Sequence, residues 1–375
     1  MAMRRPAEVF PPGDFLREEL EERGWTQADL ADIVGRPIGT VNEIIKGKRK
    51  ITPETAEGLS SAFGTSAEFW LNLESAYQLS KLKGDNRDEI AHRAKLYAKA
   101  PIKDMVRRGW IEPSDNVVVL ESRLLRFLEI DSLDDDLDVL RHAARKGTSY
   151  GASLTPAQHV WLVRARQLSR SVQASPYQEA NLAEAVRCLK ALRRSPQELR
   201  DVPRILSEAG IKFVIVQPLP GNRIDGACFW ADESPVIAMS LRYDRIDNFW
   251  FVLMHELGHL ERGIETLDTD LDATKSDAEK PATEREADTF AMEQLVPQQE
   301  MERFIAGARS HYSDRDISAF AEAIGVHPGI VVGQLHHRKE LSFSSYRTTL
   351  EPVREVVTAA AVTDGWGTVL PVKSS

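Results

Sequence analysis

The residues best suited to chemistry are two histidines and a glutamate in the string His255-Glu256-Leu257-Gly258-His259. If this string is helical, both histidines lie on one face, about 6 Å apart along the helix axis. Two imidazole nitrogens on one face can reach a single zinc ion at about 2.0–2.1 Å. Glu256 can point at a water molecule bound to that ion and take its proton. The spacing therefore indicates a zinc site for peptide-bond hydrolysis, with His255 and His259 as ligands and Glu256 as general base.

The third zinc ligand must come from a histidine or a carboxylate. The two cysteines, Cys188 and Cys228, stand far apart and in no paired metal spacing. Zincins with a third histidine carry glycine three residues and histidine six residues after the second ligand. Arg262 and Glu265 occupy these positions, so that subclass is excluded. Glu265 could itself be a ligand, but Gly263 and the polar residues after it suggest that the helix has ended.

A better third ligand lies downstream, in the segment from Glu284 to Ala291. As a helix, this segment presents Glu284 and Asp288 on one face, one turn apart. We predict that Glu284 binds the zinc ion and that Asp288 accepts the second N–H of a ligating histidine, which fixes its tautomer. Glu286 lies about 200° around the helix from Glu284 and should face elsewhere. The alternative is that all these acids only solvate a helix.

Two kinds of element must position these residues. Apolar residues at helical spacing predict one buried helix over 248–260, which carries both histidines. Short β-branched and aromatic runs before it predict a strand and a hairpin at 211–216, 227–230 and 235–239. Further helices follow the histidines, and we expect the tail beyond Val357 to be loose.

These residues together resemble the ImmA/IrrE family of zinc metallopeptidases, over about residues 205–340. The resemblance is carried by the segments His255 to His259, Glu284 to Ala291, and Leu295-Val296-Pro297. It implies a compact zincin-like domain of helices and a small sheet, which binds zinc and cleaves a protein substrate, commonly a transcriptional repressor. Asp288 replaces a common asparagine and Leu295-Val296 replaces the usual Leu-Met, but neither change touches a metal ligand. The residue that stabilises the oxyanion is open among Tyr243, His311 and Tyr312.

The first eighty residues read as short helices separated by turns. The cadence Thr26-Gln27-x-x-Leu30-Ala31-x-x-x-Gly35, followed by Val41 and Ile44, is typical of a helix-turn-helix. Gly35 makes the turn, Ala31 permits close helix approach, and the two later apolar residues anchor the second helix. The exposed face of that second helix is then free to enter the major groove of DNA.

A local excess of positive charge supports contact with DNA. The chain carries 48 Lys and Arg against 57 Asp and Glu, a net charge of −9, which argues against a protein that coats nucleic acid all over. From Arg36 to Lys50, however, five basic residues stand against Glu43 alone, a local net charge of +4. We predict phosphate contacts from Gln27, Lys48 and Arg49, and base contacts from Thr40 and Glu43. The full predicted DNA-binding set is Gln27, Arg36, Thr40, Glu43, Lys46, Lys48 and Arg49.

The N-terminal segment resembles the Xre-type, HigA antitoxin family of helix-turn-helix proteins over about residues 10–80. The resemblance includes the unusual segment Phe69-Trp70-Leu71-Asn72-Leu73. The resemblance implies a homodimer that binds a palindromic double-stranded DNA operator and can hold a toxin partner. Ile38 and Gly39 stand where polar base-reading residues are frequent in the family. The alternative is an oligomerisation bundle with solvated basic residues. A second, similar cadence over 321–332 is better explained by packing.

Length and composition place the chain among ordinary globular proteins. Its 375 residues suggest two or three domains, and 42% hydrophobic and 28% charged residues are average values. Because no apolar run approaches the roughly 18 residues of a membrane span, and none resembles a signal peptide, we expect a cytoplasmic protein without membrane contact. We expect a mostly α fold with a small β-sheet (α+β), divided into a helix-turn-helix domain at 1–80, a helical connecting region at 81–200, a zincin-like metallopeptidase domain at 201–345 and a tail at 346–375.

These patterns predict a DNA-binding transcriptional regulator that carries a zinc-dependent endopeptidase, whose protein substrate is a repressor or the chain itself. Self-cleavage would fall near the polar linker at 81–88. The alternative is a non-catalytic HigA-like antitoxin or repressor in which the zincin-like domain is structural or sensory. Glu256 favours the enzyme, because a purely structural zinc site needs no general base.

Overall fold

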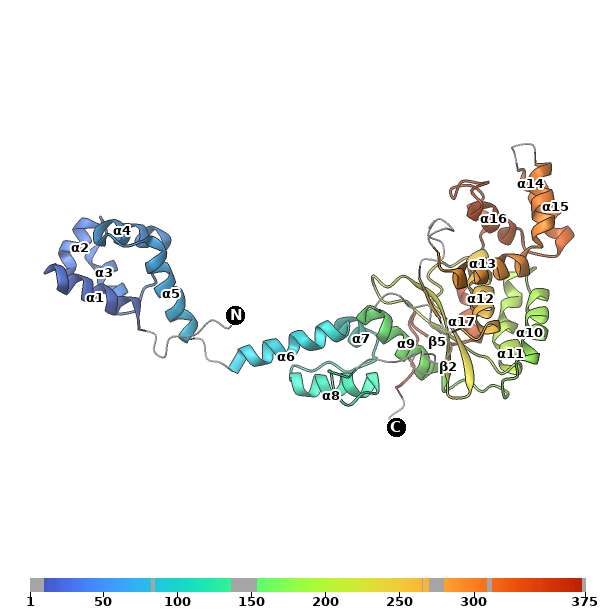
Figure 1. Cartoon of the computed structure of the whole chain (residues 1–375), viewed down its shortest axis with the longest axis horizontal. Helices are drawn as coiled ribbons and strands as arrows, with labels where there is room; N and C mark the ends of the chain where they lie inside the picture. The colour runs from blue at the N-terminus through green and yellow to red at the C-terminus, as the bar shows by residue number, and fades with distance from the viewer. Residues whose placement is uncertain are drawn as a thin grey trace. The chain divides into compact units, whose positions relative to one another are not determined.

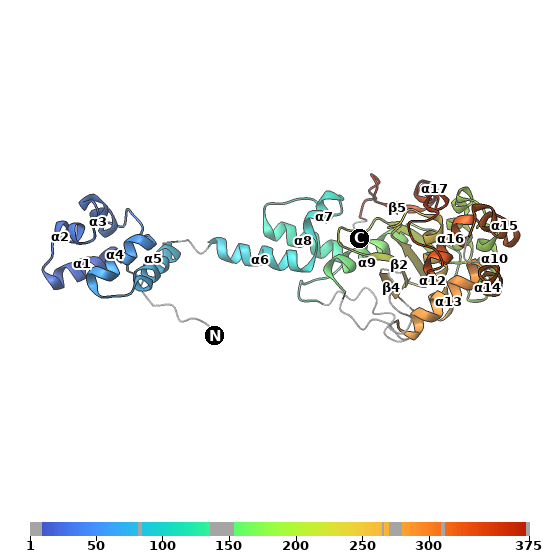
Figure 2. The same cartoon turned by 90° about the horizontal axis from the view of Figure 1, so that it is seen from above.

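The structure is a computed structural model that describes residues 10–81, 85–135, 154–264, 266–269, 280–308 and 312–372. The chain divides into two compact units, Met1–Ala91 and His92–Ser375 (Figures 1 and 2). No helix within the described ranges is long and apolar enough to cross a bilayer.

The first unit is helical throughout its described part. Its helices are α1 (Pro12–Arg23), α2 (Gln27–Ile33), α3 (Ile38–Ile45), α4 (Pro53–Phe63) and α5 (Ala67–Lys81). Helix α6 (Asp85–Lys99) runs across the division between the units. We expected the polar linker to extend to Asp88, which is wrong from Asp85 onward, where α6 begins. Residues 82–84 lie outside the described ranges.

The pair α2 and α3 is held by a cap, a turn and a shared core. Thr26 Oγ1 accepts a hydrogen bond from the Asp29 amide at 3.2 Å, and Asp29 Oδ2 accepts one from the Thr26 amide at 2.7 Å. This reciprocal capping box satisfies two backbone donors at the start of α2. Gly35 follows at a φ of +61°, a left-handed conformation that favours glycine. Val41 and Ile44 of α3 are buried in the same core as Leu30 of α2.

The second unit is built around a mixed five-stranded sheet. Its strands are β1 (Lys212–Val216), β2 (Ile224–Ala231), β3 (Ser234–Met239), β4 (Thr266–Thr269) and β5 (Val362–Asp364). They lie in the order β4-β2-β3-β1-β5. Strand β1 runs parallel to β3 and β5, whereas β2 runs antiparallel to β3 and β4. The predicted strand and hairpin are therefore confirmed, and two short edge strands are added to them.

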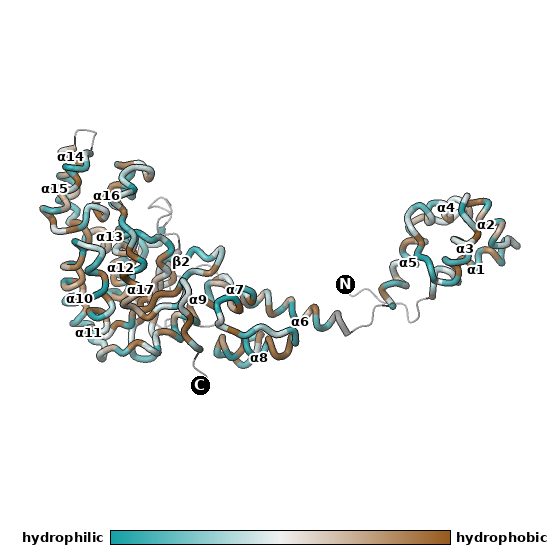
Figure 3. The backbone as a smooth tube through the Cα atoms, turned by 180° about the vertical axis from the view of Figure 1, so that it is seen from behind, coloured by the Kyte–Doolittle hydropathy of each residue, from teal (hydrophilic) through white to brown (hydrophobic). Residues whose placement is uncertain are grey.

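Helices cover both faces of this sheet (Figure 2). Alternate residues of β1 point to opposite sides, so that Val214 joins a core with α6–α9 while Phe213 and Ile215 join a second core with α10–α17. Hydrophobic segments gather where the strands and α17 lie (Figure 3). This confirms a mostly helical α+β fold. The helices are α7 (Ile102–Arg107), α8 (Val117–Leu128), α9 (Pro156–Ser169), α10 (Ala180–Ala191), α11 (Val202–Glu208), α12 (Ile246–Glu261), α13 (Ala282–Leu295), α14 (Gln298–Gly307), α15 (Asp314–Ile324), α16 (Pro328–His337) and α17 (Arg354–Ala360), with 3₁₀ turns at Pro196–Asp201 and Arg347–Thr349.

Most of the predicted connecting region belongs to the second unit. Helix α9 packs on the sheet, where the indole Nε1 of Trp161 donates to the Val216 carbonyl at 3.0 Å. Helix α10 contributes Leu189 to the core on the opposite face. From His92 onward this stretch is therefore part of the fold around the sheet rather than a separate connector.

The expectation of a loose tail beyond Val357 is wrong as far as Asp364. Strand β5 completes the sheet by pairing with β1, and Asp364 is fully buried. Its Oδ2 accepts a hydrogen bond from the Trp110 indole at 3.0 Å and forms an ion pair with Arg164. Burial raises the pKa of Asp364, although the charge and hydrogen bond of Arg164 oppose that effect. The tail is ordered because its polar group has buried partners far away in the sequence.

We expect Arg164→Met to destabilise the second unit by about 3–5 kcal/mol, because it leaves the Asp364 carboxylate buried without its cation. Urea unfolding followed by tryptophan fluorescence measures the loss. The control is Arg170→Met, which removes an ion pair with Glu129. The side chains of Arg170 and Glu129 are 39% and 37% exposed. That change should cost less than about 1 kcal/mol. Equal losses in the two variants would contradict the structural role of the buried pair.

Candidate metal centre

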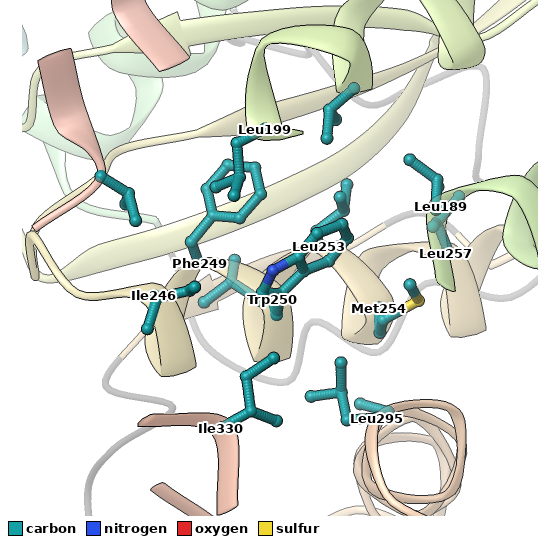
Figure 4. Close-up of a cluster of buried hydrophobic side chains, with 14 of the residues drawn as sticks. Leu189, Leu199, Ile246, Phe249, Trp250, Leu253, Met254, Leu257, Leu295 and Ile330 are labelled. Atoms are coloured by element: carbon teal, nitrogen blue, oxygen red, sulfur yellow. The ribbon is translucent and has the colours of Figure 1, made fainter. Parts of the chain in front are cut away.

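Helix α12 carries both predicted histidine ligands through the interior of the second unit. Its apolar residues pack on several sides, and Figure 4 shows Trp250 and Leu253 between Leu199 and the pair Leu295 and Ile330. A helix that is hydrophobic all round is typical of a protein core. The side chains of the string at 255–259 are accordingly held inside, with His255, Glu256 and His259 fully buried.

Gly258 allows α13 to lie close to α12. A Cβ atom built on Gly258 would lie 3.1 Å from Phe290 Cδ1 and 3.3 Å from Phe290 Cβ, which is tighter than ordinary side-chain contact. Glycine inside a helix is about 1 kcal/mol less favourable than alanine. Its presence here is explained by the close approach of the second helix, which brings Glu284 and Asp288 opposite the histidines.

Three potential ligand atoms converge between these helices. His255 Nε2 lies 2.9 Å from His259 Nε2, and Glu284 Oε2 lies 3.3 Å from the first of these atoms and 3.6 Å from the second. Tetrahedral ligands at about 2.0–2.1 Å from a zinc ion stand about 3.3 Å apart. Two imidazoles and one carboxylate are also a donor set that catalytic zinc sites use. The residues present therefore fit a zinc ion, and the structure brings together the three side chains predicted to bind it.

The Glu284 carboxylate is held in its ionised form. Burial alone would raise its pKa, but hydrogen bonds and the charges of His255 and His259 outweigh burial and hold the pKa well below the ordinary value. A carboxylate that stays ionised is ready to bind a cation, because no proton has to be displaced from it.

Asp288 lies behind the first histidine. Its Oδ1 is 3.0 Å from His255 Nδ1, and its Oδ2 accepts a hydrogen bond from Lys280 Nζ at 2.5 Å. Burial raises the pKa of Asp288, but His255 and then Lys280 oppose it and the pKa falls below its ordinary value. A carboxylate at Nδ1 keeps the imidazole proton on that nitrogen, which leaves a lone pair on Nε2 for a metal.

Glu256 is oriented by the sheet rather than by α13. Its Oε2 accepts a hydrogen bond from the hydroxyl of Thr266 on β4 at 3.1 Å. On the adjacent strand β2, a Cβ atom on Gly226 would collide with the Glu256 carboxylate, so glycine makes room for it there. The carboxylate next to the ligand pair is thus fixed by two strands.

Sequence reasoning missed three of these supporting residues: Gly226, Thr266 and Lys280. An isolated glycine within a strand pattern marks a bulge or a close backbone approach, so Gly226 carried a signal that could have been used. Thr266 and Lys280 carried no such signal, because nothing in the sequence distinguishes a single threonine or lysine of a site from one on the surface.

Of the other predicted residues, Glu286, Tyr243 and Tyr312 each have a polar partner of their own. Glu286 faces away from the cluster, as expected, and pairs with Arg262 at 3.1 Å. The hydroxyl of Tyr312 donates to Glu340 at 2.9 Å, and burial together with this contact raises the pKa of Tyr312 to about 12. The Tyr243 hydroxyl accepts a hydrogen bond from Arg242 at 2.8 Å. His311 and Glu265 lie outside the described residues.

In the first unit, the predicted DNA-binding residues lie on and around α3. Thr40 and Gln27 are half-buried, whereas the other members of the set are exposed. Arg49 Nη1 donates to Thr40 Oγ1 at 2.8 Å, and Arg49 Nε lies 3.5 Å from Glu43 Oε2. Arg49, which we predict to contact phosphate, therefore interacts with Thr40 and Glu43, which we predict to contact bases. The separate roles of the three residues stay predictions.

The second helix-turn-helix cadence is explained by packing. Ala321 and Val326, with Val331 and Val332 of α16, are buried in the core of the second unit.

Comparison with known proteins finds a family match in each unit. A helix-turn-helix family model matches residues 16–70. The HTH-type transcriptional regulator YddM of Escherichia coli K12, itself uncharacterized, is 34% identical over 70 residues, which are 19% of this chain and 74% of that protein. Antitoxin HigA-1 of Vibrio cholerae is 37% identical over 94 residues, 25% of this chain and 82% of that protein. The chain belongs to the HigA-type helix-turn-helix family.

The second unit of this HigA-type chain has its own match. The peptidase family model described as the IrrE N-terminal-like domain matches residues 207–336, which include the whole predicted ligand set. Both resemblances seen in the sequence are thus confirmed. Among solved structures, Pseudomonas aeruginosa antitoxin HigA with the higBA promoter is 37% identical, covering 23% of this chain and 94% of that chain with a TM-score of 0.22.

We expect Asp288→Ala to weaken zinc binding by about 10- to 100-fold, because His255 then loses the carboxylate that lies against its Nδ1 and orients the ring. Competition with a chromophoric chelator measures the affinity. Glu286→Gln is the matched control, since it removes an acid from the same helix on the side that faces Arg262. Unchanged affinity in Asp288→Ala, or an equal loss in the control, would contradict the role assigned to Asp288.

Proposed function

We propose that this chain is a DNA-binding transcriptional regulator whose second unit is a zinc-dependent peptidase acting on a protein. The observation that carries the enzymatic part is the convergence of His255, His259 and Glu284 beside the buried carboxylate of Glu256. The match to a peptidase family model over the same residues supports it. The match to helix-turn-helix regulators, together with the basic segment from Arg36 to Lys50, supports the DNA-binding part.

In this proposal the metal is held by His255, His259 and Glu284, with Asp288 fixing the tautomer of the first histidine. A zinc ion bound there would polarise the scissile carbonyl group and make a water molecule more acidic. Glu256 would take a proton from that water and pass it to the leaving amine. Thr266 holds the carboxylate in the orientation needed for this transfer, since its hydroxyl is bonded to Oε2.

The substrate we propose is a transcriptional repressor or the chain itself. On the DNA side we propose that the chain binds an operator as a homodimer, and that a toxin can be its further partner, as the name of the Vibrio relative suggests. A HigA-like regulator with a zinc site that cleaves nothing is the competing function, and the next experiment separates the two.

We expect Glu256→Gln to retain one zinc ion per chain and to lower the cleavage rate by about 10²- to 10⁴-fold, because it removes the general base. Metal analysis gives the zinc content. Intact mass spectrometry follows two substrates: the chain itself and a repressor encoded beside its gene. Glu261→Gln is the control, because Glu261 lies on the same helix with its side chain 51% exposed. Zinc bound by the unaltered chain without any cleavage would favour the non-catalytic regulator.

We expect Lys48→Ala to weaken binding to specific and random DNA duplexes by a similar factor and to reduce the salt slope by about one, as the loss of one phosphate contact requires. Fluorescence anisotropy titrations at several salt concentrations measure both quantities. Lys81→Ala on α5 removes the same charge from the same unit outside the basic segment, and should leave the slope unchanged. A slope unaffected by Lys48→Ala would rule out that phosphate contact.

A further inference from the structure

One isoleucine lies at the surface of the helix that we expect to face DNA. Helix α3 buries Val41, Ile44 and Ile45 in the core of the first unit. Ile38, the first residue of α3, is instead 55% exposed and lies outside that core. Its side chain therefore contributes little to the packing of the described first unit. A single exposed apolar residue is common on protein surfaces, so a second observation is needed before it points to a partner.

Gly39 supplies that second observation. Its backbone is not in the left-handed conformation that favours glycine, and a Cβ atom built on it would meet no heavy atom within 4 Å. Neither the backbone nor the packing of the described chain therefore requires glycine here, although glycine is an unfavourable residue in a helix. The missing side chain leaves the backbone of the first turn of α3 uncovered next to Ile38. A partner can approach the helix closely at this turn.

The charges around this turn suit a polyanion. From Arg36 to Lys50 the sequence carries five basic residues and one acid, Glu43. Glu43 follows Gly39 by one turn on the same face, and Arg49 Nε lies 3.5 Å from its Oε2. A carboxylate paired in this way repels phosphate groups less than an isolated one does. The surface thus combines an exposed apolar side chain with surrounding positive charge.

Double-stranded DNA presents an apolar group that fits such a surface. In the major groove this group is the C5-methyl of thymine. In helix-turn-helix proteins the N-terminal residues of the second helix contact base edges in that groove. Ile38 and Gly39 occupy this end of α3, within the residues that match a helix-turn-helix family model. Contact with another protein is the other use of an exposed isoleucine, but the positive charge and the family match favour DNA.

We propose that Ile38 lies against the 5-methyl group of a thymine in the operator, and that Gly39 lets the base edges come close enough for this contact. The inference rests on the proposed DNA-binding function and adds one element of its sequence preference. Ile38 is then a residue that determines specificity, and Gly39 is a positioning residue.

Replacement of thymine by deoxyuridine tests the contact, because it removes one methyl group and leaves every hydrogen-bonding group of the base in place. Selection from random duplexes by the full chain first gives a preferred sequence. Each thymine of that sequence is then replaced in turn, and fluorescence anisotropy measures the Kd. We expect at least one thymine whose replacement weakens binding by about fourfold, as the loss of one buried methyl group requires.

Three variants of the full chain assign the effect to residues. Ile38→Ala should bind the thymine and deoxyuridine duplexes equally well. Ile33→Ala is the matched control, because Ile33 on α2 is 51% exposed, and it should keep the difference between the two duplexes. Gly39→Ala should weaken binding to the preferred duplex by at least about fivefold, since its methyl group intrudes where the bases approach. Its melting temperature should not fall, because alanine meets no neighbour there.

The outcomes separate this inference from the proposed function. If the full chain binds no duplex, or binds all duplexes equally well, operator binding itself fails. If a preferred sequence emerges but no thymine depends on its methyl group, operator binding stands and the thymine contact is overturned. The same holds if the dependence survives in Ile38→Ala or is lost equally in Ile33→Ala.

Two further results would also count against the inference. Full operator affinity in Gly39→Ala would overturn the role of Gly39. If Ile38→Ala leaves every DNA affinity unchanged but dissociates a homodimer in sedimentation velocity, the isoleucine belongs to a contact between copies of the chain and the base contact is overturned.

Discussion

The site depends on the close packing of two helices, α12 and α13. Three ligand atoms from these helices lie within 4.8 Å of one another, although Glu284 follows His259 at a distance in the sequence. Gly258 eases this approach, because a Cβ atom there would lie 3.1 Å from Phe290 Cδ1, tighter than ordinary contact. The apolar surroundings of α12 then hold the arrangement rigid, since the helix is buried among several neighbouring elements. The chemistry of the site follows from this packing.

Different elements of the second unit position different side chains of the site. Helix α13 supplies Glu284 and orients His255 through Asp288, while strands β2 and β4 place the carboxylate of Glu256. The proposed ligands and the proposed base are therefore positioned by different elements, α13 on one side and strands β2 and β4 on the other. A disturbance of the sheet edge can misplace Glu256 and leave the ligand set intact, whereas a disturbance of α13 affects the ligands first.

The parts of the structure that could be predicted from sequence are those specified by local periodicity. The i, i+4 spacing of His255 and His259 and the same spacing of Glu284 and Asp288 indicated which side chains share a face, and the cadence around Gly35 indicated the turn between α2 and α3. Long-range pairings left no local pattern. Strand β5 has three residues and is defined by its pairing with β1, and Thr266 acquires its role only when β4 lies beside β2. The layering of α9 on the sheet likewise depends on contacts distant in sequence.

The position of β5 in the chain has a consequence for how the protein is made. Strand β5 follows the other four strands of the sheet in the chain and therefore leaves the ribosome after them. Domains generally fold as units during synthesis, the N-terminal one first. The helix-turn-helix unit is therefore complete while the second unit still lacks β5 and the buried partner of Arg164. A ribosome that stalls before β5 would release a chain whose first unit can fold while the sheet of its second unit is still incomplete.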